Sequence, residues 1–273
     1  MQSWPRELGG IERLQVVVGC QRSGTTVTAQ VLGAVPGSLL VDETDGLYDW
    51  FFAATRGDGS STAALLERAA EKYLDRGSRS FEAPRPGVGT LVLQAPNLTY
   101  DEQLLGSLPL AVEIVYVVRD PRAVIASMGG LDVDFVGNQL RWMARRMTDR
   151  AAVVELGRRL RDASLPQHVR RAVLWQVKTG RRDAFLSVGL PTHQIRYEQL
   201  VRNPVAELAA LGVVAPPVDV YIGHGPGGTD RSRSVDGASQ DLWRDVLSIE
   251  QERDVLAAAS PLAEALGYRF MPR

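Results

Sequence analysis

Hydrophobic and polar positions follow two different periods along this chain. Short continuous apolar runs predict strands buried on both faces, and they lie at Leu14–Val18, Ser38–Val41, Gly89–Pro96, Ala111–Val118 and His193–Tyr197. Stretches of helical periodicity lie at Gly24–Val35, Thr62–Arg76, Val136–Ala163, His168–Val188, Glu198–Leu211 and Ser248–Tyr268. Strands that alternate with helices predict an α/β fold with a parallel sheet flanked by helices. We expect one domain over residues 1–273, with a helical insert between the fourth and fifth strands.

Local signals place some helix ends. Asp120 is expected to cap a helix whose first residue is Pro121, because proline at that position has no N–H to lose. Ser248 and Gln251 form a capping box at the start of the last helix. Residues Tyr221–Ser239 are rich in glycine and polar residues without periodicity, which predicts a loop.

The first strand and helix are joined by a P-loop-type turn, within "VVVGCQRSGTTVTAQVLG". A glycine-bounded turn before a helix directs backbone N–H groups and the positive end of the helix dipole at one point, which suits an anion. Gly19 and Gly24 permit the tight path, and the hydroxyls of Ser23, Thr25 and Thr26 can donate to phosphate oxygens. The turn therefore predicts a phosphate site.

This turn lacks the parts that nucleotide hydrolysis needs. A P-loop kinase has a lysine on the terminal phosphates and an acidic residue for Mg²⁺. Thr25 stands where that lysine belongs, and the strand that might supply the acid ends in Arg119. A transfer without metal, from a nucleotide with fewer charges, fits better. A P-loop kinase remains an alternative, which would require Mg²⁺-dependent consumption of ATP.

A second anion site is predicted in "VYVVRDPRAVIASM". Arg119 ends a buried strand, and Ser127 lies eight residues later, about two turns into the next helix. A guanidinium and a hydroxyl can hold a phosphate together. Arg122 can join them or pair with Asp120. Two anion sites at one edge of a sheet predict a ligand phosphorylated at two positions.

These motifs resemble those of sulfotransferases that use 3′-phosphoadenosine-5′-phosphosulfate (PAPS). "GCQRSGTT" is similar to their 5′-phosphosulfate loop, and "RDPRAVIAS" is similar to their 3′-phosphate motif. "IRYEQLVRNP" resembles the segment that brings a tyrosine, here Tyr197, near the nucleotide, and the C-terminal stretch resembles theirs in its Trp and its Leu-Gly-Tyr. The pattern is closest to protein-tyrosine sulfotransferases and their bacterial relatives. The resemblance implies a three-layer sandwich, PAPS as donor, 3′,5′-ADP as product, and no metal.

The resemblance also implies roles for residues near the transferred group. Glu43, in "SLLVDETDGLY", matches the general base of the relatives, although Asp42 or Asp45 can take its place or the three can form a solvated turn. Arg22 can stabilise charge on the bridging oxygen, because arginine stays protonated. Gln94 departs from the pattern, since the relatives usually carry Lys-x-Pro there. Its amide can still donate a hydrogen bond. The lost charge leaves a non-catalytic nucleotide-binding relative as an alternative.

The remaining candidates lie in the glycine-rich loop and in the core. Arg233 lies ten residues before Trp243, with Arg231 as its neighbour, and the relatives carry a lysine at about that spacing. The resemblance implies that Arg233 contacts the nucleotide from a closing lid, and a solvated surface arginine is the alternative. His224 is a reserve base, and the three histidines lack metal-ligand spacing. Cys20 is expected to be a small packed residue, with oxidation sensing as the other interpretation.

Composition narrows the partners. A net charge of −1 argues against a protein-wide positive field for nucleic acid. One cysteine excludes an intrachain disulfide, no apolar run approaches the ~18 residues of a membrane span, and the N-terminal stretch lacks the apolar part of a secretion signal. We expect a cytoplasmic protein that acts on a hydroxyl-bearing acceptor: a small natural product, a saccharide or a tyrosine. The sequence predicts neither the acceptor nor the oligomeric state.

Overall fold

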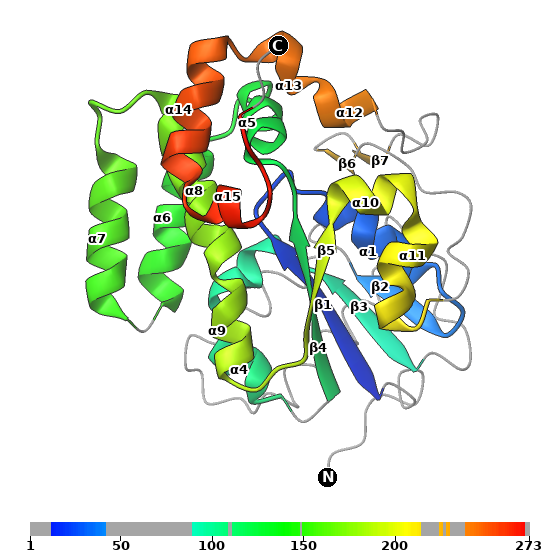
Figure 1. The fold of residues 1–273 in the computed structure, drawn as a ribbon. Coiled ribbons are helices and arrows are strands. Elements are labelled where there is room, and N and C mark those ends of the chain that lie inside the picture. Colours follow the sequence, from blue (N-terminus) through cyan, green and yellow to red (C-terminus); the bar gives the residue numbers. More distant parts are fainter. Residues whose placement is uncertain are drawn as a thin grey trace.

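Five parallel strands form the central sheet, in the order β2-β3-β1-β4-β5 (Figure 1). The structure is a computed structural model and describes residues 12–41, 89–108, 111–147, 149–213, 224–225, 228–229 and 238–270. The strands are β1 (Arg13–Gly19), β2 (Ser38–Val41), β3 (Thr90–Gln94), β4 (Ala111–Val118) and β5 (Thr192–Arg196). All five predicted strands are therefore confirmed, with ends that differ by two residues at most. A short antiparallel pair, β6 (His224–Gly225) and β7 (Gly228–Thr229), lies apart from this sheet in the pairing pattern.

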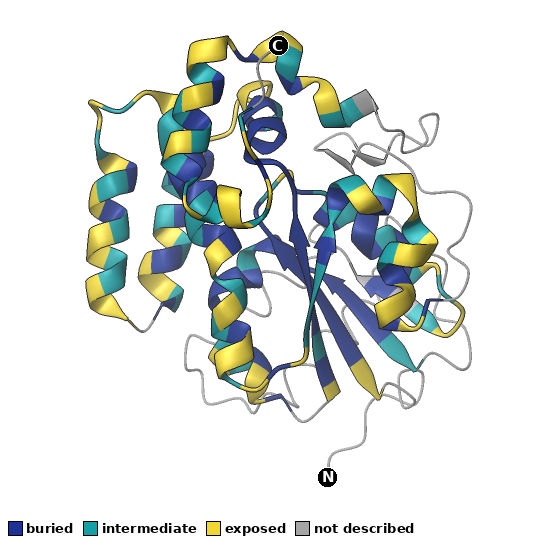
Figure 2. Ribbon diagram, viewed as in Figure 1, coloured by how far each residue is buried: buried dark blue, intermediate teal, exposed yellow. Residues whose placement is uncertain are grey.

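Helices cover both faces of the sheet and make three layers, as expected (Figure 1). One face packs against α1 (Thr25–Gly33), α10 (Tyr197–Arg202) and α11 (Pro204–Leu208). The other face packs against α5 (Pro121–Gly129), α8 (Gln167–Gly180) and α14 (Ile249–Ala259). The central strands are dark blue in Figure 2, because side chains from the helical layers cover both of their faces. This double burial explains why the strands read as continuous apolar runs.

The remaining helices complete the described part of the chain. They are η1 (Pro96–Tyr100), α4 (Glu102–Gly106), α6 (Phe135–Arg146), α7 (Arg150–Arg161), α9 (Arg182–Ser187), η2 (Ala209–Leu211), α12 (Ala238–Asp241), α13 (Trp243–Val246) and α15 (Leu262–Ala265). Helices α5 to α9 lie between β4 and β5, which confirms the helical insert. The helix predicted at Thr62–Arg76 lies outside the described residues.

Four predicted helical stretches were too long, and one of them, Ser248–Tyr268, divides between α14 and α15. The helix predicted over Val136–Ala163 is two helices, because the Asp149 side chain accepts a hydrogen bond from the Ala152 N–H and starts α7 anew. The stretch predicted over Glu198–Leu211 breaks before α11, where the Asn203 side chain caps that helix ahead of a proline. The helix predicted over His168–Val188 divides between α8 and α9. The predicted caps are confirmed: Asp120 caps α5, and the capping box starts α14.

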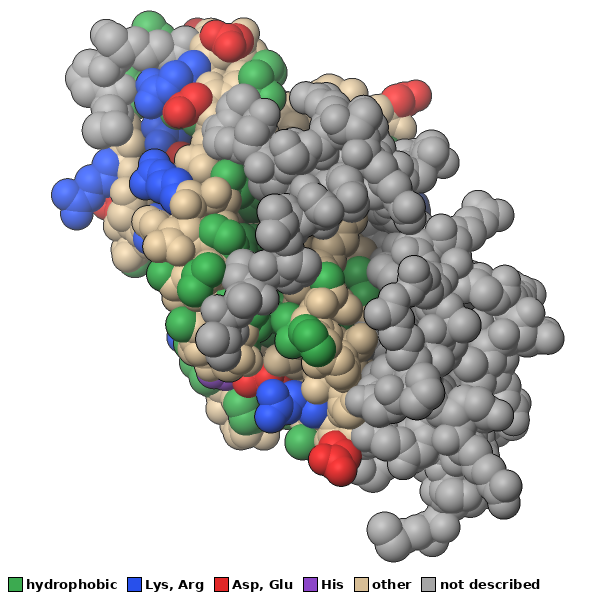
Figure 3. All heavy atoms as spheres, turned by 90° about the vertical axis from the view of Figure 1, so that its right-hand side faces the viewer, with side chains coloured by type: hydrophobic (Ala, Val, Ile, Leu, Met, Phe, Trp, Pro, Cys, Tyr) green, Lys and Arg blue, Asp and Glu red, His purple; other side chains and the backbone are tan. Residues whose placement is uncertain are grey.

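The surface carries charges of both signs. On the face drawn in Figure 3, Lys and Arg side chains share the coloured part of the surface with Asp and Glu side chains. Such mixing fits the nearly neutral net charge. Among the described residues, no helix has both the length and the apolar character that crossing a bilayer requires.

A buried carboxyl group between η1 and α4 makes the stability of the protein depend on pH. Burial raises the pKa of Asp101 from 3.8 to about 7, against the opposing effect of Arg146, whose guanidinium lies 3.2 Å from Asp101 Oδ1. The charge of Glu102 raises this pKa further, and Arg181 lowers it. The folded state therefore holds this proton above the pH at which the unfolded chain loses it. The protonated Asp101 therefore stabilises the folded state fully below about pH 4, and this contribution is lost as the pH rises to about 7.

Replacing Asp101 with asparagine should remove this dependence, because the amide resembles the protonated acid in shape and stays neutral. We expect the free energy of unfolding of Asp101→Asn, relative to the unmodified protein, to rise by about 2–4 kcal/mol between pH 4 and pH 7 and then level off. Urea denaturation of both proteins across this range measures the difference. A difference that stays constant with pH would contradict the raised pKa.

Candidate active site

The turn between β1 and α1 has the conformation that its glycines allow. Gly19 and Gly24 have φ values of +151° and +97°, in the region that side chains other than hydrogen disfavour. A Cβ atom on Gly24 would lie 2.2 Å from Cδ2 of Tyr197, so the ring from α10 also requires glycine there. Arg22 has a φ of +69°, an uncommon value for arginine that occurs at functional sites. The turn is a tight cradle ahead of the α1 N-terminus.

Hydroxyl and amide groups with incomplete hydrogen bonding surround this cradle. Ser23 is fully buried, and its Oγ has no hydrogen-bond partner within the described part of the chain. Thr25 is buried and Thr26 half-buried at the start of α1. Gln94 ends β3 with a buried side chain whose Nε2 donates to Thr26 Oγ1 at 3.1 Å, while its Oε1 has no partner among the residues described. Buried polar atoms normally have partners, so these atoms indicate a polar ligand.

Arg119 follows β4 and turns its side chain towards the same cradle. Its Nη1 donates to the carbonyl oxygen of Arg22 at 3.1 Å, and its Nη2 donates to that of Ser239 in α12 at 2.6 Å. The guanidinium carbon lies 4.3 Å from the centroid of the Tyr197 ring. Burial lowers the pKa of Arg119, opposed by the nearby Tyr197 and Glu198. A buried guanidinium whose Nε lacks a partner in the described structure is a strong site for an anion.

The two predicted anion sites are in direct contact. Arg22 Nε donates to Ser127 Oγ at 3.0 Å, so a loop residue reaches the helix that carries the second motif. Together with the bond from Arg119 to the Arg22 carbonyl, this contact joins both motifs at the carboxyl edge of the sheet. Tyr197 lies beside them, and its hydroxyl is 2.8 Å from Ser239 Oγ. The structure thus brings together the predicted residues Arg22, Ser23, Gly24, Thr25, Thr26, Gln94, Arg119, Ser127 and Tyr197.

Other predicted residues lie outside the described part of the chain. They are Glu43 with its alternatives Asp42 and Asp45, and Arg233 with Arg231. His224 lies in β6, where the structure describes its backbone but not its side chain. Their roles stay predictions.

Sequence reasoning missed two residues that hold this site. Lys178 on α8 is fully buried, and its Nζ donates to Gln21 Oε1 at 3.0 Å and to the Pro96 carbonyl at 2.6 Å. Lys178 therefore links the turn between β1 and α1 to the segment after β3 through hydrogen bonds. Its signal was a lysine seven residues after Arg171, on the buried face of a helix. Ser239, which contacts Arg119 and Tyr197, carried no signal of its own.

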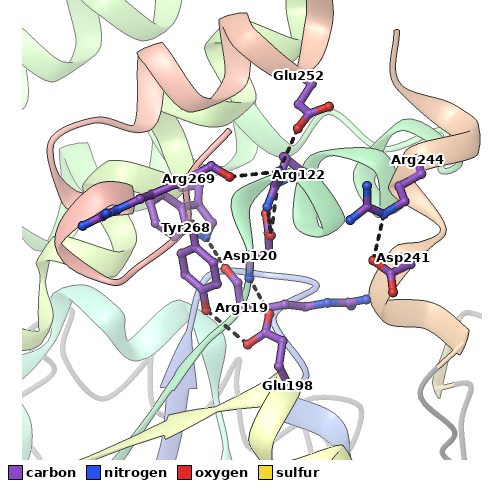
Figure 4. A network of polar contacts seen from close by, with 10 residues as sticks. Arg119, Asp120, Arg122, Glu198, Asp241, Arg244, Glu252, Tyr268 and Arg269 are labelled. Carbon is purple, nitrogen blue, oxygen red and sulfur yellow. Dashed lines mark hydrogen bonds and ion pairs between the residues drawn. The ribbon is translucent and has the colours of Figure 1, made fainter. Parts of the chain in front are cut away.

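A second cluster of charges stabilises the segment that carries Arg119 (Figure 4). Arg122 binds the Asp120 carboxylate through Nε and Nη2, at 3.0 and 2.7 Å, and its Nη1 donates to Glu252 at 2.8 Å. The guanidinium carbon of Arg122 also lies 4.1 Å from the Trp243 ring centroid. Of the two roles left open for Arg122, pairing with Asp120 is the one observed.

The cysteine and two of the histidines have structural surroundings. Cys20 is buried, and burial raises the pKa of its thiol to about 12, so it is a packed residue rather than a reactive thiolate. His193 lies 2.9 Å from Glu113 on the neighbouring strand, and His168 lies 3.0 Å from Asp254. No cluster of three or more potential metal ligands occurs among the described residues.

Comparisons with known proteins identify the family of this chain through a family model and support its fold through solved structures. A family model described as "Sulfotransferase family" matches residues 16–213. The sulfotransferase domain of the Synechococcus PCC 7002 olefin synthase has a similar structure, with a TM-score of 0.56 and 16% identity over 99% of this chain and 100% of that domain. The sulfotransferase domain from the curacin biosynthetic pathway gives 0.52 and 17%, over 99% and 100%. At such identities these structures support the fold alone. No protein with a curated description matches the chain.

Proposed function

Because the chain belongs to the sulfotransferase family, we propose that it transfers a sulfuryl group from PAPS to a hydroxyl-bearing acceptor. The observation that carries this proposal is the contact between the two anion motifs, with the buried guanidinium of Arg119 bonded to the Arg22 carbonyl. A donor with phosphate groups at both ends of its adenosine needs two such sites on one sheet edge.

The residues present fit this donor. The backbone N–H groups of the turn, with Ser23, Thr25 and Thr26, would hold the 5′-phosphosulfate. Arg119 and Ser127 would hold the 3′-phosphate, with Tyr197 beside the nucleotide. The unpartnered Ser23 Oγ and Arg119 Nε, both among the described atoms, support this assignment because each can donate to a phosphate oxygen.

The chain's own groups would then act on an acceptor hydroxyl that attacks the sulfur in line. PAPS supplies the sulfuryl group, and 3′,5′-ADP leaves when the bond from sulfur to the bridging oxygen breaks. Glu43 would take the proton of the hydroxyl, and Arg22 would stabilise the charge that develops on the bridging oxygen. Gln94 can assist if its amide turns over, because Oε1 would then accept from the Thr26 hydroxyl and Nε2 would be left to donate. Arg233 would contact the nucleotide from a lid.

Gln94 also supports a second candidate function, a nucleotide-binding protein without catalysis. Its side chain is neutral where the resemblance implies a lysine that helps the leaving group. The buried Lys178 does not replace that charge directly, because its ammonium donates to Gln21 and Pro96. Binding of nucleotide without turnover across a broad acceptor panel would favour this candidate.

Calorimetry with 3′,5′-ADP, compared with ATP and Mg²⁺, tests the proposal. We expect 3′,5′-ADP to bind at least about 10-fold more tightly, a difference of about 1.4 kcal/mol, because the turn lacks the lysine for a triphosphate. Transfer of labelled sulfate from PAPS should then be screened on natural-product alcohols, saccharides and tyrosine peptides. Preference for ATP with Mg²⁺ would instead support the kinase alternative.

A further inference from the structure

The peptide group between Arg119 and Asp120 is held on both sides by side chains. Trp175 Nε1 on α8 donates to the carbonyl oxygen of Arg119 at 3.0 Å. On the other side, the N–H of Asp120 donates to Glu198 Oε1 on α10 at 2.8 Å. The second oxygen of Glu198 accepts a hydrogen bond from the Tyr268 hydroxyl at 3.1 Å, so the carboxylate is itself fixed (Figure 4). This arrangement, the peptide clamp, consists of Trp175, Glu198 and Tyr268.

The clamp acts where the sheet no longer holds the chain. Strand β4 ends at Val118, so its ladder does not extend to the peptide after Arg119. Rotation about the N–Cα bond of Arg119 would move its carbonyl group and its Cβ together, because both are attached to the same Cα. Fixing the next peptide therefore fixes the direction in which the Arg119 side chain leaves the backbone.

We propose that Glu198 is a positioning residue that aims Arg119 at the 3′-phosphate, through its hydrogen bond with the Asp120 N–H. This inference rests on the proposed function. The charge of Glu198 by itself opposes anion binding, since it is close enough to influence Arg119. Loss of the negative charge should thus raise nucleotide affinity, whereas loss of the hydrogen bond that positions Arg119 should lower it. Variants of Glu198 can distinguish these two effects.

The test compares two nucleotides that differ in the 3′-phosphate alone. Calorimetry gives the ratio of the dissociation constant of 5′-AMP to that of 3′,5′-ADP. We expect Glu198→Ala to lower this ratio about 10-fold, the lower limit for loss of an orienting partner at metal sites. Glu198→Gln should keep the ratio at or above that of the unmodified protein, because its amide oxygen still accepts from Asp120 while the charge is gone. If Glu198 affected nucleotide binding through its negative charge alone, both variants would raise the ratio.

Glu102→Ala is the matched control. Like Glu198→Ala, it removes a partly buried carboxylate, but this one lies on α4, at the opposite end of the sheet, where it pairs with Arg181 at 2.5 Å (Figure 1). Its ratio should stay unchanged, even if its melting temperature falls. If Glu198→Ala does not fold, Tyr268→Phe removes the bond that fixes the carboxylate and should lower the ratio about 3-fold.

The outcomes separate this inference from the function on which it rests. An unmodified protein that does not prefer 3′,5′-ADP to 5′-AMP would overturn the proposed 3′-phosphate site and the inference with it. A normal preference that Glu198→Ala leaves unchanged, or raises as Glu198→Gln does, would overturn the positioning role alone. With an unfolded alanine variant, an unchanged ratio in Tyr268→Phe leads to the same conclusion.

Discussion

Arg119→Ala is expected to weaken binding of 3′,5′-ADP by about 30-fold or more, the usual effect of removing one partner of a buried charged pair. Arg119 is only 8% exposed, so a phosphate bound to its guanidinium is poorly screened by water. Binding of 5′-AMP, which lacks the 3′-phosphate, should change by about 3-fold at most, corresponding to less than 1 kcal/mol. Calorimetry with both nucleotides measures the two effects.

Arg119→Lys separates charge from geometry in the same experiment. A lysine keeps the positive charge but cannot donate to two acceptors in the fixed planar arrangement of a guanidinium. Its affinity for 3′,5′-ADP should therefore lie between those of the alanine variant and the unmodified protein. Arg122→Lys, which alters the neighbouring pair with Asp120, serves as a comparison for general damage to this segment. If Arg119→Ala loses affinity for both nucleotides equally, the second anion site is misplaced.

Glu43→Gln is expected to lower the turnover number by about 10²- to 10⁴-fold, the contribution of a general base. Glu43 lies two residues after the end of β2 in the sequence, and β2 pairs in parallel with β3, the strand that ends at Gln94. The chain therefore leaves β2 at the sheet edge where the anion motifs meet. Glutamine keeps the size of the side chain and cannot accept the proton, so the affinity for 3′,5′-ADP should stay nearly unchanged.

Asp42→Asn and Asp45→Asn are the matched controls for the base, because each removes one charge from the same acidic stretch. Steady-state rates of sulfate transfer, with an acceptor found in the screen, compare the three variants. Full activity in Glu43→Gln would remove Glu43 from the mechanism. A large loss in one aspartate variant would move the role of the base to that residue.

The strands and the glycines of the turn were predictable because their causes are local. An apolar run buried on both faces and a glycine at a positive φ leave their marks in a few consecutive residues. Arg119 was predictable as a candidate because a charge at the end of a buried strand stands out. The contact between Arg22 and Ser127 was not, since it joins residues 105 positions apart through side-chain conformations. The hydrogen bond from the Asp120 N–H to Glu198 likewise joins residues 78 positions apart, so no local pattern announces it.

Helix ends were predicted less well than strands, although their causes are also local. Asp149 and Asn203 carry ordinary capping side chains, yet the apolar period continues past each of them. Periodicity averages over several turns, whereas a cap acts on one N–H group, so the longer pattern hid the break. Lys178 was hidden differently. A charged residue on an apolar helix face usually reaches solvent, and here backbone and amide oxygens meet it inside the core.

The ring of Tyr197 lies so close to Gly24 that a Cβ atom there would clash with it, and the guanidinium of Arg119 lies over the face of the same ring. An aromatic ring is rigid and does not shorten or lengthen as a flexible side chain does. The distance between the glycine turn and the Arg119 guanidinium is therefore fixed by the dimensions of the ring that lies against both. For a ligand with two negatively charged groups, we therefore expect affinity to depend more on the distance between these groups than on the size of their charges.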